Sequence, residues 1–211
     1  MERLIEVEKM EHLINLFGSF DENVRLIEKE LDVAIINRGS EIKVAGEPDG
    51  VDRALSTIQN LLAIAARGDS IGEQEVRYVL SQIEAGNAEQ LEELGKDVIC
   101  ISTRGVPIKA KTLGQKQYVN SMKDSSIVFG IGPAGTGKTY LAVAAAVAAF
   151  KSKEIDRIIL TRPAIEAGES LGFLPGDMQE KVDPYLRPLY DALGEMMGYE
   201  VFHKNLERGM I

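Results

Sequence analysis

Apolar residues recur first at helical spacing and then at alternating spacing in the early part of the chain. Val24, Ile27 and Leu31 occupy one face of a helix that is expected over residues 22–31. The segments on either side of Asn37-Arg38-Gly39-Ser40 are rich in β-branched side chains, which predicts two strands joined by a turn. The pattern thus indicates a helix followed by a hairpin.

Two more helices are expected after this hairpin. Pro48 suits the first turn of a helix, and an apolar stripe continues over residues 48–68. Ser70 and Glu73 have the spacing of a capping box, which predicts the start of the next helix. The order helix, strand, strand, helix predicts a small α+β domain over residues 1–86.

The apolar pattern changes in the second half of the chain. Residues 126–131 and 157–161 are mainly apolar runs, which is typical of parallel strands buried on both faces. An alanine-rich helix is predicted between them over residues 138–150, and another over residues 184–197. These segments predict a βαβ unit in an α/β domain.

Turn residues separate the two parts. Thr103-Arg104-Gly105 lies between two short apolar runs, which predicts a short β-hairpin. We therefore predict a linker with this hairpin over residues 87–110 and a second domain over residues 111–211.

Composition is that of a soluble globular protein. The 211 residues are 45 % hydrophobic and 27 % charged. The longest apolar run, residues 140–150, is shorter than the roughly 18 residues of a membrane span, so no membrane association is expected. No secretory signal is visible in residues 1–8, which predicts a cytoplasmic protein. Cys100 is alone, so it is expected to be a small buried hydrophobe, and His12 and His203 lack the spacing of a metal site.

Charge is distributed unevenly. Residues 1–100 carry 10 Lys/Arg against 21 Asp/Glu, a net charge of −11, whereas residues 101–211 carry a net charge of +2. An acidic first half argues against broad, salt-driven nucleic-acid binding there. A solvated acidic surface that aids solubility is the simpler interpretation.

A phosphate-binding motif follows the first expected parallel strand. Its pattern, G-x-x-x-x-G-K-[ST], wraps the β- and γ-phosphates of a nucleoside triphosphate. It consists of Gly132, Pro133, Ala134, Gly135, Thr136, Gly137, Lys138 and Thr139. Its glycines let backbone N–H groups turn inward, and the following helix presents its positive end to the same anion.

Two side chains of the motif are candidate catalytic residues. Lys138 is expected to place its ammonium group on the β/γ oxygens, and the Thr139 hydroxyl is the candidate Mg²⁺ ligand. The alternative is a glycine-rich turn that merely caps a core helix.

Three longer stretches carry a resemblance to a known family. They are KTLGQKQY at residues 111–118, GIGPAGTGKTYLA at residues 130–142, and TRPAIEAGESLGFLPGD followed by KVDPYLRPLYDAL within residues 161–193. Together they resemble the PhoH family of bacterial P-loop ATPases, over residues 111–203. The resemblance implies a P-loop NTPase fold with a parallel sheet, similar to superfamily-one helicases, that binds ATP with Mg²⁺ and hydrolyses it.

The first hundred residues resemble the KH-like module that precedes the ATPase in many PhoH-like proteins. Residues 16–21, LFGSFD, lie where a KH domain carries its GXXG backbone clamp for single-stranded RNA. Asp21 and Glu22 put carboxylates where a glycine, often with a basic residue, is expected. RNA binding through this loop and a helix N-cap supplied by Asp21 are both open.

The resemblance implies further roles. Thr112 and Gln115 are similar to the helicase Q motif, whose amide pairs with the adenine edge, although Gln115 could also be a solvent-facing helix residue. Residues 161–163 are similar to helicase motif Ia, which contacts a nucleic-acid backbone. Arg187 would contact a phosphate bound to a neighbouring subunit if the protein forms a homo-oligomeric ring. Four carboxylates in the same segment are interpreted as surface charges: Glu166, Glu169, Asp177 and Asp183.

One family feature is not found. Hydrolysis by P-loop enzymes needs an Asp on a later apolar strand, usually beside a Glu that activates water, and no such run follows residue 161. We therefore expect these residues to be the N-terminal portion of a longer PhoH-like protein, with little hydrolysis of its own.

The leading hypothesis is an ATPase coupled to RNA metabolism, helicase-like or a partner of an RNA-processing nuclease. The alternative is a nucleotide-gated scaffold whose acidic first domain binds a protein. A small-molecule kinase is the least favoured reading, because no second substrate pocket can be indicated.

Overall fold

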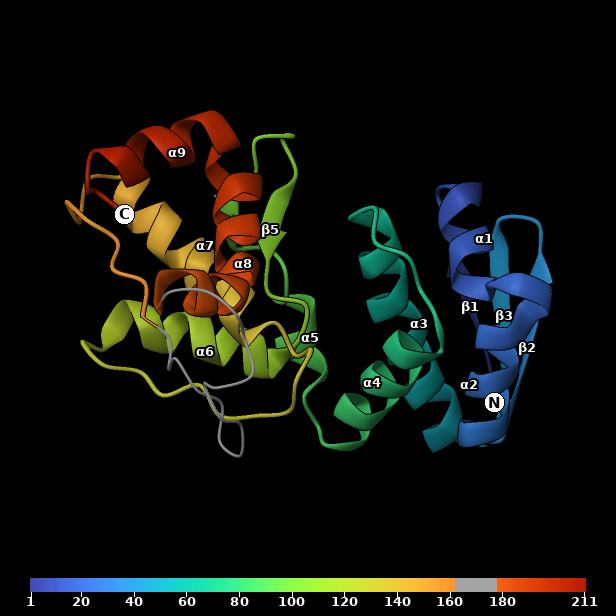
Figure 1. Cartoon of the computed structure of the whole chain (residues 1–211). Helices are drawn as coiled ribbons and strands as arrows, with labels where there is room; N and C mark the ends of the chain where they lie inside the picture. The colour runs from blue at the N-terminus through green and yellow to red at the C-terminus, as the bar shows by residue number, and fades with distance from the viewer. Residues whose placement is uncertain (162–177) are drawn as a thin grey trace. The chain divides into compact units, whose positions relative to one another are not determined.

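The computed structural model describes residues 1–161 and 178–211, and side chains outside residues 162–185. The chain divides into two compact units, Met1–Glu93 and Leu94–Ile211, which are described separately (Figure 1). Residues 87–110, expected to be a linker, are shared between the units: helix α5 (Ala88–Glu92) belongs to the first, and the β4–β5 hairpin to the second.

The first unit contains an antiparallel sheet of three strands, in the order β1, β3, β2. The expected hairpin is present as β2 (Val33–Arg38) and β3 (Glu41–Gly46), while β1 (Glu2–Glu6) was not predicted. Lys43 pairs with Leu4 on one side and Ile36 on the other.

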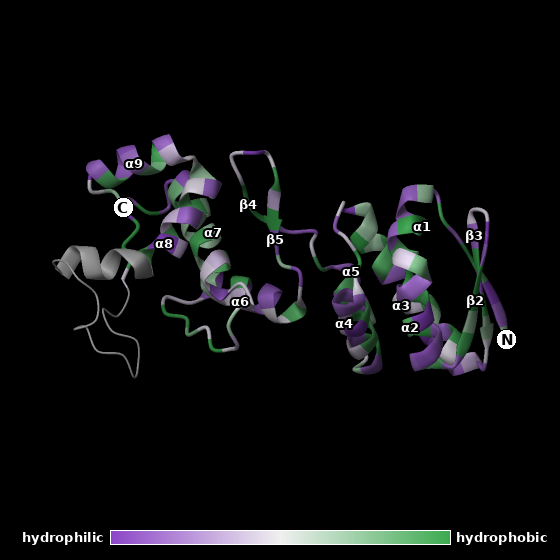
Figure 2. Ribbon diagram, turned by 45° about the vertical axis from the view of Figure 1, so that its right-hand side comes forward, coloured by the Kyte–Doolittle hydropathy of each residue, from purple (hydrophilic) through white to green (hydrophobic). Residues whose placement is uncertain are grey.

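Helices cover one face of this sheet (Figures 1 and 2). They are α1 (Met10–Phe17), α2 (Glu22–Leu31) and α3 (Pro48–Ala66), and the last two confirm the predicted spans. Their apolar faces meet the inward side chains of the strands and form a core that includes Leu16, Val24, Ile27, Ile42, Val44, Val51, Ile58 and Leu61. The strand residues Leu4 and Ile36 point away from this core and are exposed.

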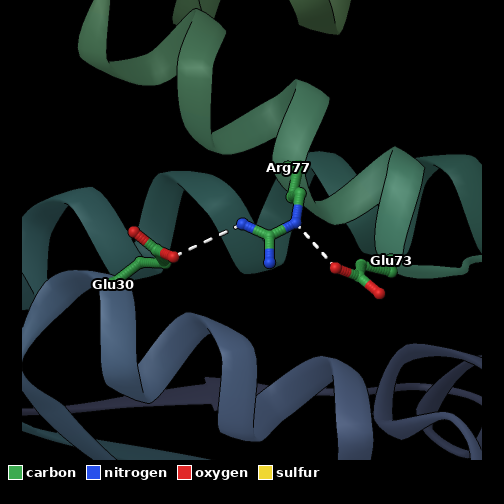
Figure 3. Close-up of polar contacts among 3 residues, drawn as sticks. All are labelled: Glu30, Glu73 and Arg77. Carbon is green, nitrogen blue, oxygen red and sulfur yellow. Dashed lines mark hydrogen bonds and ion pairs between the residues drawn. The ribbon is translucent and has the colours of Figure 1, made fainter.

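Helix α4 (Glu73–Glu84) begins two residues later than the capping-box spacing predicts. The Gly72 N–H donates to Glu75 Oε2 at 3.0 Å, so Glu75 rather than Glu73 closes the first turn. Glu73 instead accepts a bond from Arg77 Nε at 2.8 Å, and Arg77 Nη1 lies 3.4 Å from Glu30 Oε1 on α2 (Figure 3). Arg77 thus connects α4 to α2 at the surface.

The second unit is built from a hairpin and four helices among the described residues. These elements are β4 (Val98–Ile101), β5 (Pro107–Lys109), α6 (Leu113–Asp124), α7 (Lys138–Lys151), α8 (Met178–Met197) and α9 (Tyr199–Glu207). Their core contains Cys100, Ile108, Val143, Ala144, Val147, Ile158, Leu193, Met196 and Phe202. The hairpin is tied to α8 by two bonds from Thr103 to the Glu195 carbonyl, from its N–H at 3.2 Å and its hydroxyl at 2.9 Å.

The expected pair of parallel strands is not formed. Residues 126–131 and 157–161 have no strand partner among the described residues, whose sheets are both antiparallel. Phe129 and Ile131 are 85 % and 95 % exposed, while Ile158 alone of the second segment is buried in the core. A short parallel strand is stable only between neighbouring strands with helices on both faces, and the described part of the chain supplies no such neighbour.

The helices and the possible metal-ligating side chains of the described part of the chain have no arrangement typical of a membrane span or a metal centre. None of its helices combines the length and the apolar composition that crossing a bilayer requires. No group of His, Cys, Asp and Glu side chains in it is arranged to hold a metal ion, which includes His12 and His203.

Candidate nucleotide-binding site

The phosphate-loop motif directly precedes α7, as the sequence predicts, but the segment before it, residues 126–131, is not the predicted strand. Gly135 and Gly137 have φ of 76° and 82°, a region that favours glycine, so the backbone can fold back tightly before the helix. Gly137 is the N-cap of α7 and provides no side-chain cap, so the N–H groups of the first turn remain available to an anion.

Lys138 extends back over the loop that precedes it. Its Nζ donates to the Gly132 carbonyl at 2.8 Å, to the Pro133 carbonyl, and to the Thr136 hydroxyl at 3.2 Å. The Thr136 hydroxyl in turn donates to the Pro133 carbonyl at 3.0 Å. The loop is therefore closed around an ammonium group, which places a positive charge where phosphate oxygens are expected.

Thr139 follows on the first turn of α7, and its side chain is exposed. A hydroxyl at this position is a suitable ligand for Mg²⁺, which keeps several coordination sites for phosphate and water. The groups that the loop offers are backbone N–H groups, the Lys138 ammonium and the hydroxyls of Thr136 and Thr139, and this set fits a Mg²⁺-bound triphosphate.

Gln115 lies beside the loop and uses both ends of its amide. Oε1 accepts a bond from the Lys111 N–H at 2.7 Å, and Nε2 donates to the Thr136 carbonyl at 3.2 Å. Gln115 is therefore no isolated solvent-facing residue: it connects the segment before α6 to the phosphate loop. An adenine edge would have to replace one or both of these bonds.

Helix α6 begins with a side-chain cap and lies close to Gly130. The Thr112 hydroxyl caps the helix by accepting the Gln115 N–H at 3.2 Å. At Gly130 a Cβ would lie 3.0 Å from the Tyr118 ring, which is closer than an ordinary van der Waals contact, so a larger residue there would require the ring to shift. The T-x-x-Q spacing was the available signal for Thr112, whereas nothing local indicated Tyr118.

A hollow of about 590 Å³ lies beside the start of α7. Its walls include Arg104, Tyr140, Asp191, Glu195 and Tyr199. The Tyr140 hydroxyl donates to Glu195 Oε1 at 3.1 Å, and burial, together with this carboxylate, raises the pKa of the phenol. This bond holds the first turn of α7 against α8, so it supports the phosphate loop from the side of the core.

Part of the segment similar to motif Ia and the four carboxylates interpreted as surface charges cannot be placed. Residues 162–163 and the side chains of Glu166, Glu169, Asp177 and Asp183 lie outside the described residues. Arg187 is described and exposed on α8.

The loop at residues 18–21 differs from the expected N-cap. Asp21 precedes α2 in a left-handed conformation, with φ of 60° and ψ of 24°, and its side chain makes no capping bond. Asp21 therefore occupies the N-cap position of α2, but its side chain does not cap the helix, because a capping side chain needs an extended backbone at that position. Gly18 and Phe20 also have positive φ, of 71° and 53°.

The chain is similar to known proteins over most of its length. The family model described as PhoH-like protein matches residues 107–211. A PhoH-like protein of Bacillus subtilis (strain 168) is 48 % identical over 198 residues, which cover 94 % of this chain and 62 % of that protein. A PhoH-like protein of Mycobacterium tuberculosis (strain ATCC 25618 / H37Rv) is 50 % identical over 200 residues, which cover 94 % of this chain and 56 % of that protein.

A more distant relative matches a smaller part. Protein PhoH of Escherichia coli (strain K12) is 39 % identical over 126 residues, 60 % of this chain and 34 % of that protein. No solved structure matches the chain. The chain thus spans about six tenths of the length of the curated relatives that it matches over nearly all of its own residues.

Proposed function

The chain belongs to the PhoH-like protein family, and from this premise we propose that residues 132–139 bind the phosphates of ATP together with Mg²⁺. The family is generally associated with ATP binding. The observation that carries the proposal is the placement of Lys138 Nζ inside its own loop, bonded to the Gly132 carbonyl and the Thr136 hydroxyl at the start of a helix. A loop that merely capped a core helix would have no need of a lysine folded back over it.

Each group in the loop has a separate task. The backbone N–H groups at the start of α7 bind phosphate oxygens, Lys138 neutralises the β/γ charge, and the Thr139 hydroxyl is the proposed Mg²⁺ ligand. Gln115 is the proposed reader of the adenine edge, because an amide has both a donor and an acceptor.

We propose that the whole protein hydrolyses ATP. Water forms a bond to the γ-phosphorus while the bond from this phosphorus to the bridging oxygen breaks, giving ADP, inorganic phosphate and a proton that passes to solvent. Lys138 is the catalytic residue proposed here, because its ammonium can follow the charge that develops on the β/γ oxygens.

Coupling to RNA is the wider role that we propose for the whole protein. It rests on the family resemblance and on the order β-α-α-β-β-α with which the first unit begins, in which the α1–α2 turn is the proposed KH-like clamp. An RNA-processing nuclease as partner, a homo-oligomeric ring and a cytoplasmic location are proposed on the same basis.

A second candidate function is favoured by a specific observation. The first unit, residues 1–93, is strongly acidic, and Asp21 and Glu22 are exposed at the loop where RNA phosphates would lie. Carboxylates repel phosphates, so this unit is better suited to a protein partner. In that case the protein would be a nucleotide-gated scaffold.

Two measurements test these functions. Calorimetric titration of this chain with Mg·ATP is expected to show binding that Lys138→Ala removes, and no heat with the unsubstituted chain would refute nucleotide binding. ATP hydrolysis by the whole protein is then compared with and without single-stranded RNA. Stimulation by RNA supports the first function, and indifference to RNA supports the scaffold.

A further inference from the structure

The turn between α1 and α2 has an unusual backbone. Gly18, Phe20 and Asp21 all have positive φ, and only the first of them is a glycine. The left-handed region is uncommon for a side chain with a Cβ, and for a bulky residue such as phenylalanine it is a genuine outlier. Backbone outliers of this kind cluster at ligand clamps and interaction sites.

The strained turn places an aromatic ring in solvent. Phe20 is 92 % exposed, so the fold gains no burial from the ring in return for its backbone conformation. A single exposed apolar residue is common on protein surfaces, but two more apolar side chains are exposed on the preceding helix. Met10 and Ile14, on the helix that leads into the turn, are 57 % and 64 % exposed.

Met10 and Ile14 lie on one face of α1. They are four residues apart, which makes them neighbours along the helix surface, while Leu13 and Leu16 of the same helix are buried in the core. A row of side chains at this spacing is the kind of ridge that packs into the groove of another helix. We call the exposed apolar residues of this segment, Met10 and Ile14 on α1 and Phe20 in the turn that follows it, the α1 ridge.

Acidic side chains predominate around the α1 ridge. Glu11, Asp21 and Glu22 are exposed within or directly beside the segment that forms it. Two cations are also near in sequence: Lys9 lies 3.7 Å from Glu11, which partly neutralises it, and Arg25 is exposed on the next helix. The first unit as a whole has 20 Asp/Glu against 9 Lys/Arg. The charge is thus complementary to a basic surface and opposed to a polyanion.

We propose that the α1 ridge is a docking surface for a basic amphipathic helix of a partner protein. The apolar face of that helix would pack against Met10 and Ile14 and cover the Phe20 ring, and its Lys and Arg side chains would face the acidic surroundings. The proposal rests on the second function given above, protein binding by the acidic unit, and is independent of nucleotide binding at Lys138.

The probe is a synthetic amphipathic helical peptide with leucine on one face and lysine on the other. Its matched counterpart with glutamate in place of lysine and a single-stranded polyuridylate are compared with it by fluorescence anisotropy. The full chain is expected to bind the lysine peptide, with an affinity that falls as salt is added. No binding, or equal binding of the glutamate peptide, overturns the proposal.

Two substitutions localise the contact. Phe20→Gly is expected to weaken the lysine peptide about tenfold or more, since a central aromatic anchor carries much of the binding free energy of such a surface. Because glycine adopts positive φ freely, this variant is expected to keep or raise the thermal midpoint, so loss of binding cannot be loss of fold. Leu4→Ser, at another exposed apolar residue of the first unit, on β1, is the control and should bind as the unsubstituted chain does.

The remaining outcomes also decide. Equal weakening by Phe20→Gly and Leu4→Ser would mean diffuse electrostatic attraction and overturn the α1 ridge. Tight polyuridylate binding that Phe20→Gly removes would assign the loop to RNA and overturn it as well. Lys138→Ala should leave peptide binding unchanged, which separates a failure of this surface from a failure of the nucleotide site.

Discussion

The amide of Gln115 donates a hydrogen bond to the Thr136 carbonyl at 3.2 Å, which connects α6 directly to the phosphate loop. The other end of the same amide accepts the Lys111 N–H at 2.7 Å. A residue proposed to read the base is therefore also a support of the loop that is proposed to bind the phosphates. Its two proposed roles can be separated by comparing ATP, which carries a base, with inorganic tripolyphosphate, which does not.

Gln115→Ala is expected to weaken the binding of ATP, GTP and inorganic tripolyphosphate to different extents. Loss of one neutral hydrogen bond to the loop costs about 0.5–1.5 kcal/mol, so tripolyphosphate should bind roughly 2–10-fold more weakly. A further loss that affects ATP more than GTP measures contact with adenine. Calorimetry with all three ligands checks this, and an unchanged ATP/GTP preference would leave Gln115 as a support of the loop alone.

Lys138→Ala is expected to remove most of the affinity for triphosphate. A charge-assisted hydrogen bond contributes about 1.5–3 kcal/mol, which corresponds to a loss of roughly 10–150-fold. The thermal midpoint without ligand should hardly change, because the ammonium contacts the loop and not the core. Lys123→Ala, at the exposed end of α6, is the matched control. If both variants bind Mg·ATP equally well, the loop is not the site.

Cys100 is expected to resist alkylation in the folded chain. Burial raises the pKa of its thiol, although the Lys151 ammonium opposes part of this effect, so less thiolate is present at a given pH than in the unfolded chain. Because the unfolded chain loses the thiol proton first, the free energy of unfolding should fall as pH rises past the ordinary pKa of a cysteine. Iodoacetamide labelling followed by mass spectrometry, with and without denaturant, checks the first point. Equal rates in both would contradict the buried position.

Gly194→Ala is expected to destabilise the second unit. A Cβ at this position in α8 would lie 2.4 Å from the Tyr199 ring, so the ring or the helix must shift, at a cost of about 1–3 kcal/mol. Gly114→Ala is the control, because a Cβ there meets nothing within 4 Å and alanine favours a helix. Urea unfolding compares the two. If the shift is the cause, Gly194→Ala combined with Tyr199→Ala should cost less than the sum of the single changes.

Much of the first unit could be predicted from its apolar spacing. The α2 and α3 helices and the β2–β3 hairpin follow from local patterns, because each buries one face on a core that its own sequence defines. Strand β1 was missed because its residues are mostly exposed and charged, and its place depends on pairing with distant β3. The start of α4 was displaced because two glutamates had plausible capping positions, and only the fold selects Glu75.

The second unit shows where sequence patterns are insufficient. The motif located Lys138 and Gln115, but the bonds from Gln115 to Lys111 and Thr136 depend on how α6 packs, which no local pattern contains. The apolar run at residues 126–131 predicted a strand from composition alone. A strand also requires a partner for its backbone, and sequence windows do not report the partner.

The position of Lys138 has a consequence for how the loop meets its ligand. Lys138 Nζ bonds to the Gly132 and Pro133 carbonyls, so the loop holds a positive charge at the position where the phosphates are proposed to bind. In the proposed function, a triphosphate would replace these carbonyl partners with phosphate oxygens around a cation that is already in position. As proposed, nucleotide binding then exchanges the hydrogen-bond partners of a charge that is already in place, and it does not have to assemble a new site.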